Sequence, residues 1–343
     1  MHIGILGAGN ISDTHTRAAR EIPGVRVVAV CGRTRERAEA LAGRAGATPY
    51  TDVQQFLAHR PMDLVAIGSP SGLHAGHAIP AVRQGLHVVV EKPLDISVAR
   101  VDELAAEAER AGVKVGVFFQ DRLKPDVRRM KSLVDSGRLG TPVLASGHVK
   151  WYRPPEYYGG SRWRGTWALD GGGALMNQGI HTADLLLHLF GDVVSVSARA
   201  ATRVHRIEVE DTVVAALEFE SGALGVLEAA TSIYPGYARR LELTGVEGTL
   251  ILDHDRLAGI DLKTPSDDRP TPPDGAGAQS AASPIVGDAT PHRRILEDFL
   301  NAIATGGRPA CDAREGRRSV ALVEAIYRSA RENRPVPVDR ANA

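Results

Sequence analysis

Short apolar runs alternate with helical patterns through the first 120 residues of the chain. The runs are rich in β-branched residues and lack polar positions on either face, which is typical of parallel strands buried on both sides. Strands are predicted at residues 2–6, 25–30, 64–68, 87–93 and 113–119, and helices at 14–21, 34–45, 75–84 and 98–112, the last with Ser97 as its cap. This alternation predicts a doubly wound α/β domain.

The pattern changes beyond Gln120, where strands follow one another instead of alternating with helices. A helix is predicted at 124–135, strands at 143–152, 193–203, 211–220, 223–232, 240–245 and 248–253, and closing helices at 292–304 and 313–333. Short turns such as Glu220-Ser221-Gly222 favour an antiparallel or mixed sheet in a second domain. Residues 264–291 are rich in Pro, Asp, Ser, Gly and Ala and are expected to form a surface loop, either a lid or a disordered segment.

Composition limits the kinds of partner. Lys plus Arg and Asp plus Glu both number 41 in 343 residues, so no bulk charge attracts nucleic acid or an anionic membrane. Cys31 and Cys311 show no metal or disulfide spacing, which favours a reducing compartment and no metal site. No apolar run reaches the roughly 20 residues that span a bilayer. The start of the chain lacks the features of a secretion signal, so we expect a cytoplasmic protein.

A glycine turn after the first strand indicates dinucleotide binding. Gly7 and Gly9 follow a buried strand, and Asn10 and Ile11 lead into a helix whose N-terminus suits a pyrophosphate. At the end of the second strand, where an acidic residue commonly holds the ribose 2′-hydroxyl, this chain has Gly32-Arg33-Thr34. Arginine there suits a 2′-phosphate, so NADP is at least as compatible as NAD. These arginines also fit a solvated helix start.

The strand at 87–93 ends in Glu91-Lys92-Pro93. Ligands of parallel sheets bind at the carboxyl ends of strands, so Lys92 is expected near the cofactor. Burying a lysine is costly unless it is paired, so Lys92 needs a structural partner or a chemical role.

The segment from Asp170 to His188 carries the second candidate site. Three glycines precede an apolar helix on which Asn177, His181, Asp184 and His188 are expected to form one polar stripe. His181 is either a satisfied core histidine or a functional residue, and its position beside Asn177 after a glycine loop favours the second interpretation. We interpret His188 as structural. Asp184 either orients His181 or caps the domain interface, and both interpretations remain open.

Aromatic residues cluster just before this segment. Residues 151–167 contain all three tryptophans and three of the seven tyrosines. Such clustering suggests a wall that stacks on a sugar, or a hydrophobic patch for a subunit partner.

Taken in order, the glycine turn, Ser69-Pro70 with His74, Glu91-Lys92-Pro93 and the glycine-rich segment leading to His181 resemble the Gfo/Idh/MocA oxidoreductase family. The resemblance covers essentially the whole chain. It implies an NAD(P)-binding Rossmann domain at 1–121 and, at 122–343, an α+β domain with a large open, mostly antiparallel sheet that binds substrate and often forms homodimers or homotetramers.

The resemblance also implies roles for individual residues. Lys92 would hydrogen-bond the reacting oxygen and the nicotinamide ribose, and His181 would be the general base. The expected cofactor contacts are Gly7, Gly9, Asn10, Ile11, Gly32, Arg33, Thr34, Ser69, Pro70, His74, Glu91, Lys92 and Gln120. The expected substrate contacts are Lys92, Arg122, Trp163, Arg164, Asn177 and His181, with Lys92, His181 and Asn177 as the catalytic set.

One residue departs from the family pattern. Inositol and glucose dehydrogenases usually have Asp four residues before the catalytic His, where this chain has Asn177. Asn can hold a hydroxyl but cannot relay a proton, which puts strict inositol dehydrogenase activity in doubt and favours sugar nucleotides, uronates or other cyclitols. Arg153, Arg162 and Arg164 could bind a carboxylate or phosphate, or could be ordinary surface arginines.

The expected function is therefore NAD(P)-dependent hydride transfer to or from a secondary hydroxyl or ketone of a sugar, sugar derivative or cyclitol. Two alternatives remain open at this point: an NAD-dependent glycosidase acting by transient oxidation and elimination, and a non-catalytic nucleotide-sensing module. The substrate, the physiological direction and the oligomer size do not follow from the sequence.

Overall fold

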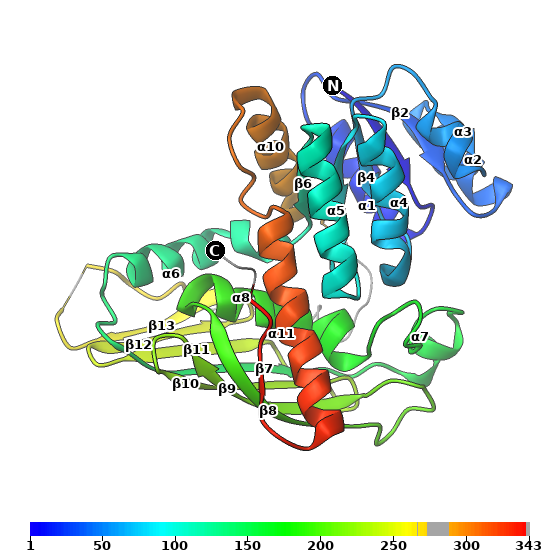
Figure 1. Ribbon diagram of the computed structural model, residues 1–343. Coiled ribbons are helices and arrows are strands. Elements are labelled where there is room, and N and C mark those ends of the chain that lie inside the picture. Colours follow the sequence, from blue (N-terminus) through cyan, green and yellow to red (C-terminus); the bar gives the residue numbers. More distant parts are fainter. Residues whose placement is uncertain (266, 273–287, 341–343) are drawn as a thin grey trace. The chain divides into compact units, whose positions relative to one another are not determined.

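The computed structural model describes residues 1–265, 267–272 and 288–340 (Figure 1). The chain forms two compact units, one of Met1–Gln120 with Ile285–Arg317 and one of Asp121–Pro284 with Arg318–Ala343. The segment from 288 to 317 thus groups with the first unit, whereas the sequence analysis placed it in the second domain; the predicted boundary at residue 121 stays a prediction. Most of the surface loop expected at 264–291 lies outside the described residues.

The first unit contains a parallel sheet in the order β3-β2-β1-β4-β5-β6. Its strands are β1 (His2–Leu6), β2 (Arg26–Cys31), β3 (Thr48–Tyr50), β4 (Leu64–Ile67), β5 (His87–Val90) and β6 (Val115–Val117). Every residue of β4 is buried, as expected for a strand covered on both faces. The strand order reverses between β1 and β4, which is the position where doubly wound sheets bind ligands. The predicted fold of this domain is confirmed.

Helices cover this sheet: α1 (Asn10–Arg20), α2 (Arg35–Ala45), α3 (Val53–Leu57), α4 (His74–Arg83), α5 (Val98–Ala111) and α10 (Thr290–Thr305), with a short 3₁₀ turn at Ser71–Leu73 (Figure 1). Ser97 occupies the predicted N-cap position of α5, but its side chain makes no capping hydrogen bond. The α10 helix packs on α1, and its Phe299 ring fills the space where Gly116 of β6 lacks a Cβ. This packing explains why α10 belongs to the first unit.

The second unit contains an eight-stranded sheet in the order β13-β12-β11-β7-β10-β9-β8-β14. Its strands are β7 (Pro142–Lys150), β8 (Val193–Ala201), β9 (Thr212–Phe219), β10 (Leu224–Ala230), β11 (Arg240–Gly245), β12 (Gly248–Asp253), β13 (Arg256–Leu262) and β14 (Val336–Pro337). Only β7 and β10 pair in parallel; the other neighbours are antiparallel. The prediction of a mostly antiparallel sheet is confirmed, although β13 and β14 were not predicted.

The helices of this unit are α6 (Pro125–Asp135), α7 (Pro155–Gly159), α8 (Ile180–Phe190) and the part of α11 (Ala313–Glu332) that begins at Arg318. Among them, α8 packs on β7 and β11, and α6 packs on β12 and β13. On β7, Gly147 lies directly against Thr182 and Leu186 of α8. Alternate positions therefore face away from α8, and among them Leu144, Val214 and Leu224 are 46%, 49% and 60% exposed. None of the described helices is long and apolar enough to cross a membrane.

Candidate functional site

The glycine turn after β1 leaves room for a ligand at the N-terminus of α1. Gly7 has a φ of +123°, and a Cβ there would approach the carbonyl oxygen of Gly68 to 2.6 Å, so no other residue fits without strain. A Cβ on Gly9, in contrast, would meet nothing within 4 Å. Gly9 is the extended N-cap of α1, so the first N–H groups of the helix face open space where a pyrophosphate fits. The residues present therefore suit a dinucleotide.

The end of β2 has no carboxylate between Gly32 and Arg35. A Cβ on Gly32 would come within 2.7 Å of the Ala8 side chain, so glycine is required for the close approach of the two turns. Arg33 and Arg35 are both exposed, and Arg35 forms an ion pair with Glu39 at 3.3 Å. Arg33 is therefore a better candidate than Arg35 to bind a 2′-phosphate.

The end of β5 is fixed by buried histidines. The strand itself ends at Val90, earlier than predicted, and Glu91-Lys92-Pro93 follow it. The Glu91 carboxylate lies 2.9 Å from His15 Nε2, and the Pro93 carbonyl oxygen lies 2.7 Å from His74 Nδ1. The residues on both sides of Lys92 are thus hydrogen-bonded to helices of the same unit.

His74 was predicted to contact the cofactor, and the structure places its side chain in the interior. It is 1% exposed, and its Nε2 lies 2.9 Å from the carbonyl oxygen of Ser69. Burial lowers the pKa of His74, while its bonds to the Pro93 and Ser69 carbonyl groups oppose that shift. This geometry supports a role in joining the turn after β4 to the turn after β5.

A π-helical turn, Ala174–Gly179, precedes α8 in the second unit. Its glycine-rich lead-in makes close contacts within the same unit, because a Cβ on Gly172 would lie 2.1 Å from the Tyr327 hydroxyl and one on Gly173 would lie 1.8 Å from the Glu210 carbonyl oxygen. The Glu210 carboxylate accepts hydrogen bonds of 2.9 Å from the Gly173 and Leu175 N–H groups and from the Tyr327 hydroxyl. These contacts anchor the start of the π turn.

Asn177 lies within the π turn and bonds to a buried carboxylate. Its Nδ2 donates to Asp170 Oδ1 at 2.6 Å, and its Oδ1 accepts from Gln178 Nε2 at 3.2 Å. Asp170 also accepts from the Gly165 N–H at 2.9 Å and is 1% exposed. The orientation of the Asn177 amide is therefore set by Asp170.

His181 lies in the first turn of α8, with its Nδ1 3.4 Å from Asp121 Oδ2. Asp121 belongs to a charge network with Lys124 at 2.5 Å and Arg239 at 2.7 Å, and both cations also contact Asp255. Burial opposes ionisation of Asp121, but Arg239, Lys124 and His181 together hold its pKa well below the usual range. His181 thus faces a carboxylate that favours its ionised form.

This network was not predicted from the sequence. Asp121 lies in the turn at 120–123, Lys124 just before α6, Arg239 just before β11, and Asp255 between β12 and β13. No sequence motif connects these positions.

Two residues predicted to act near His181 are paired with each other instead. Arg122 binds Asp184 through Nε at 2.8 Å and Nη2 at 2.6 Å, and Ser319 Oγ donates to the same carboxylate at 3.0 Å. Arg122 is 3% exposed. This bidentate geometry favours a structural role for Arg122 over substrate binding, and a packing role for Asp184 over orienting His181.

The aromatic segment forms cation–π contacts. The Arg164 guanidinium lies 4.4 Å from the Tyr157 ring and 5.4 Å from the Trp163 ring, and Arg153 lies 4.9 Å from the Trp151 ring. Tyr157 Oη accepts from Gln178 Nε2 at 2.9 Å, which joins this segment to the π turn. Arg153 is 2% exposed, so it is not an ordinary surface arginine.

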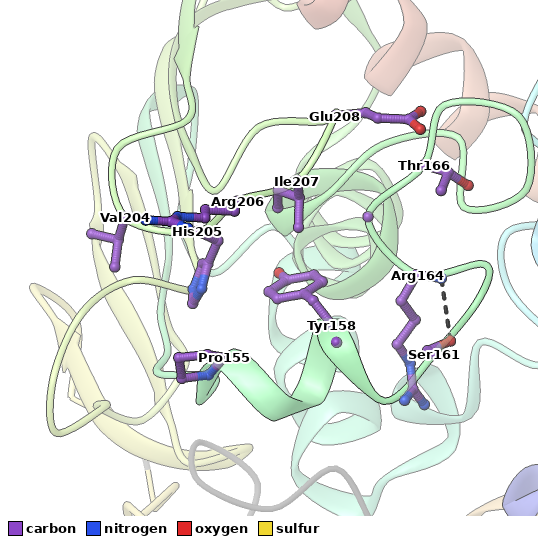
Figure 2. Close-up of a pocket in the computed structure, with 12 residues that line it drawn as sticks. Pro155, Tyr158, Ser161, Arg164, Thr166, Val204, His205, Arg206, Ile207 and Glu208 are labelled. Carbon is purple, nitrogen blue, oxygen red and sulfur yellow. Dashed lines mark hydrogen bonds between the residues drawn. The ribbon is translucent and has the colours of Figure 1, made fainter.

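A pocket of about 770 Å³ opens beside this segment, entirely within the second unit. Figure 2 shows the Tyr158 ring near its middle, Arg164 and Thr166 to one side, and residues 204–206 to the other. Burial raises the pKa of Tyr158, whose hydroxyl lies 2.8 Å from Thr231 Oγ1, so the phenol is a neutral part of the wall.

Comparison with known proteins establishes the class. Residues 1–119 match an oxidoreductase family with an NAD-binding Rossmann fold, which agrees with the parallel sheet and the glycine turn. Residues 127–251 match the C-terminal domain of the GFO/IDH/MocA proteins. The chain therefore belongs to the Gfo/Idh/MocA family of oxidoreductases, and the predictions of family, fold and enzyme class are confirmed.

Several relatives resemble the chain over its whole length. It is 28% identical to D-apiose dehydrogenase from Paraburkholderia graminis, covering 99% of this chain and 90% of the relative. It is 24% identical to myo-inositol 2-dehydrogenase from Thermotoga maritima, covering 99% of both chains. Among solved structures, the WlbA dehydrogenase from Bordetella pertussis in complex with NADH and UDP-GlcNAcA is 32% identical, covers 99% of both chains and has a TM-score of 0.90.

Proposed function

We propose that this protein is an NAD(P)-dependent dehydrogenase that transfers hydride between nicotinamide and a secondary hydroxyl or ketone of a sugar, sugar derivative or cyclitol. The observation that carries the proposal is the His181–Asp121 pair at the start of α8, in a chain with an NAD-binding Rossmann domain. The dehydrogenases of apiose and inositol among its relatives support this substrate class, and the UDP-GlcNAcA complex supports nucleotide-linked sugars within it.

The environment of His181 suits a general base. An ionised Asp121 beside Nδ1 favours the tautomer with the proton on Nδ1, in which Nε2 carries the lone pair that can accept the hydroxyl proton. Lys92 supplies a cation that stabilises charge on the reacting oxygen, and bound NAD(P)⁺ supplies the hydride acceptor. Asn177, whose amide is held by Asp170, orients a substrate hydroxyl. A metal ion is not required for this chemistry.

The residues quoted above do not favour the glycosidase or sensing alternatives, and the named relatives with known substrates are dehydrogenases. The deciding experiment measures absorbance of reduced nicotinamide with NAD and NADP against a panel of sugars, cyclitols, uronates and nucleotide-linked uronates. We expect turnover with at least one hydroxyl-bearing compound. Cleavage of a glycoside with no net reduced cofactor, or nucleotide binding with no turnover on the whole panel, would contradict the proposal.

The choice between NAD and NADP is proposed to depend on Arg33. Bound NADH in the neighbouring structure supports NAD as a cofactor. The absence of a carboxylate at residues 32–35 and the exposed Arg33 support acceptance of NADP as well. Measuring kcat/KM with NAD and with NADP tests whether the protein accepts both dinucleotides.

The face of the large sheet that points away from α8 is proposed to join copies of the chain into a homodimer or homotetramer. Leu144, Val214 and Leu224 expose apolar side chains on this face, which is unusual for a surface that faces only water. Light scattering on the wild type and on Leu224→Glu tests the proposal, since a charge in a buried interface should shift the mass toward the monomer.

A further inference from the structure

A buried cluster in the first unit lies directly beside Lys92. It consists of His15 on α1, Glu91 after β5 and His292 on α10, whose side chains are 0%, 9% and 2% exposed. Glu91 Oε1 lies 2.9 Å from His15 Nε2 and 3.3 Å from His292 Nε2. Glu91 Oε2 accepts the backbone N–H of Lys92 at 3.2 Å. One carboxylate thus contacts two imidazoles and the backbone of the proposed catalytic lysine.

Glu91 favours its ionised form and His15 its neutral form, so the carboxylate can accept a hydrogen bond from the imidazole. Burial opposes ionisation of Glu91, yet its bonds to His15 and His292 hold its pKa well below the usual range. Burial lowers the pKa of His15, so this imidazole is a neutral donor. A buried carboxylate with donors on one oxygen and a backbone N–H on the other is well satisfied, whereas losing any one donor leaves a costly unpaired charge.

Phe118 closes the cluster on one side. The His15 ring stacks on the Phe118 ring with centroids 4.4 Å apart and planes at 15°, and His292 lies 5.4 Å from the same ring. Rings packed in this way restrict movement of the imidazoles, and through them of the carboxylate. The position of Glu91 is therefore fixed by α1, α10 and the end of β6 together.

We propose that Glu91 is a positioning residue for Lys92, held in place by His15 and His292. The inference rests on the proposed function, because it assumes that Lys92 acts on the reacting oxygen. Catalysis depends steeply on such placement, since a shift of about 1 Å in a reacting group can cost about a hundredfold in rate. Two histidines and a carboxylate are also ligands that transition metals accept, so metal content is measured in the same experiment.

The key variant is Glu91→Gln. A glutamine has one acceptor oxygen and one donor NH₂, so it can accept from the imidazoles or from the Lys92 N–H, but it cannot do both. We expect kcat to fall about tenfold to a hundredfold. The dissociation constant of the dinucleotide and the KM of the sugar should stay within about threefold, because the glycine turn and the second unit are untouched.

Variants at His292 provide the rescue test. His292→Ala removes a donor and should lower kcat in the same direction as Glu91→Gln, and His292→Asn, which keeps a donor, should recover part of the loss. A structural role alone would lower the melting temperature of both variants while leaving kcat at 25 °C and the KM unchanged. That result would overturn the inference.

The failure of this inference can be told apart from failure of the proposed function. If Lys92→Ala keeps the wild-type rate, the role of Lys92 is wrong and the proposed function fails with it. If Lys92→Ala is inactive but Glu91→Gln and His292→Ala keep the wild-type kcat, only the positioning role is wrong. One equivalent of tightly bound metal in the purified protein, lost in His15→Ala, would also overturn it.

Discussion

The two proposed catalytic residues lie in environments of opposite character. Lys92 follows a strand whose last three residues are fully buried, and the carboxylate next to it contacts the imidazoles of His15 and His292. His181 follows a π turn and faces a network of two carboxylates and two cations. One environment fixes position through hydrogen bonds and packing, and the other fixes charge through ion pairs.

This difference predicts different responses to mutation and to pH. Around Lys92, Glu91 is held by hydrogen bonds and by packed rings, so substitutions there should change placement more than they change titration. Around His181, Asp121 and Asp255 balance Lys124 and Arg239, so removing any one of them leaves an unbalanced charge. The pH dependence of the enzyme should therefore be set mainly in the second unit.

The largest expected effect comes from removing either residue. Lys92→Ala and His181→Ala should each lower kcat about 10² to 10⁴-fold, the usual contribution of a positioned acid or base. Dinucleotide binding, measured by fluorescence titration, should change less than about threefold. The matched control is His188→Ala on the same helix, which should keep nearly full activity. Full activity of His181→Ala would refute its role as the base.

The two regions also differ in how far the sequence predicts them. The end of β5 could be anticipated because a run of apolar β-branched residues that stops at charged residues indicates a buried parallel strand. Even there, the contact with His292 could not be anticipated. His292 follows Glu91 in the sequence only after strands β6 to β13, and it belongs to a helix predicted for the other domain.

Helix α8 was predicted, but the π turn that precedes it was not. A polar stripe assumes 3.6 residues per turn, and a π turn at Ala174–Gly179 breaks that spacing. Asn177, His181 and Asp184 each contact a different charged residue: Asp170, Asp121 and Arg122 respectively. A carboxylate beside His181 could not be predicted because Asp121 lies in a short 3₁₀ turn with no periodic signal.

A second expected effect concerns Asn177, which stands where the family resemblance implies an aspartate. Asn177→Asp would bring a carboxylate within about hydrogen-bond distance of Asp170, so the two would share one proton and the shared pKa would rise in the folded state. A carboxyl group whose pKa is raised in the folded state favours folding at pH values below its pKa in the unfolded chain. This contribution to the free energy of unfolding is lost as the pH rises through the pKa of the folded state. The variant should therefore lose roughly 1–3 kcal/mol of unfolding free energy at pH 8 and little at pH 4.

Urea denaturation at the two pH values measures this loss. The double variant Asp170→Asn with Asn177→Asp restores one carboxylate and one amide and should regain most of the stability at pH 8. Equal stability of the single variant and the wild type at both pH values would show that the Asp170 contact does not control this position.

A third expected effect tests whether charge governs His181. Asp121→Asn removes the anion that favours the imidazolium and leaves Lys124 and Arg239 in excess, so the pKa of His181 should fall. The acidic limb of the kcat/KM profile should move to lower pH by about one unit, and the plateau should drop about tenfold because the Nδ1–H tautomer loses its partner.

The control for this prediction is Asp255→Asn, which removes a carboxylate from the same network; the contacts of Asp255 there are to Lys124 and Arg239. The acidic limb of the kcat/KM profile should shift less in Asp255→Asn than in Asp121→Asn. Equal shifts in the two variants would mean that the net charge of the network matters and that direct contact with His181 does not.

The smallest expected effect concerns cofactor choice in the first unit, away from the chemistry. Arg33→Ala should lower kcat/KM for NADP by about fivefold to tenfold, the loss of one exposed contact with a phosphate, and should leave the value for NAD nearly unchanged. Arg35→Ala is the matched control, because Arg35 is also exposed but is already paired with Glu39. Because the contact is solvent-exposed, the NADP effect should shrink as salt is raised from 50 to 500 mM. Equal losses with both dinucleotides would instead indicate that Arg33 supports the turn after β2, and would remove the argument for NADP.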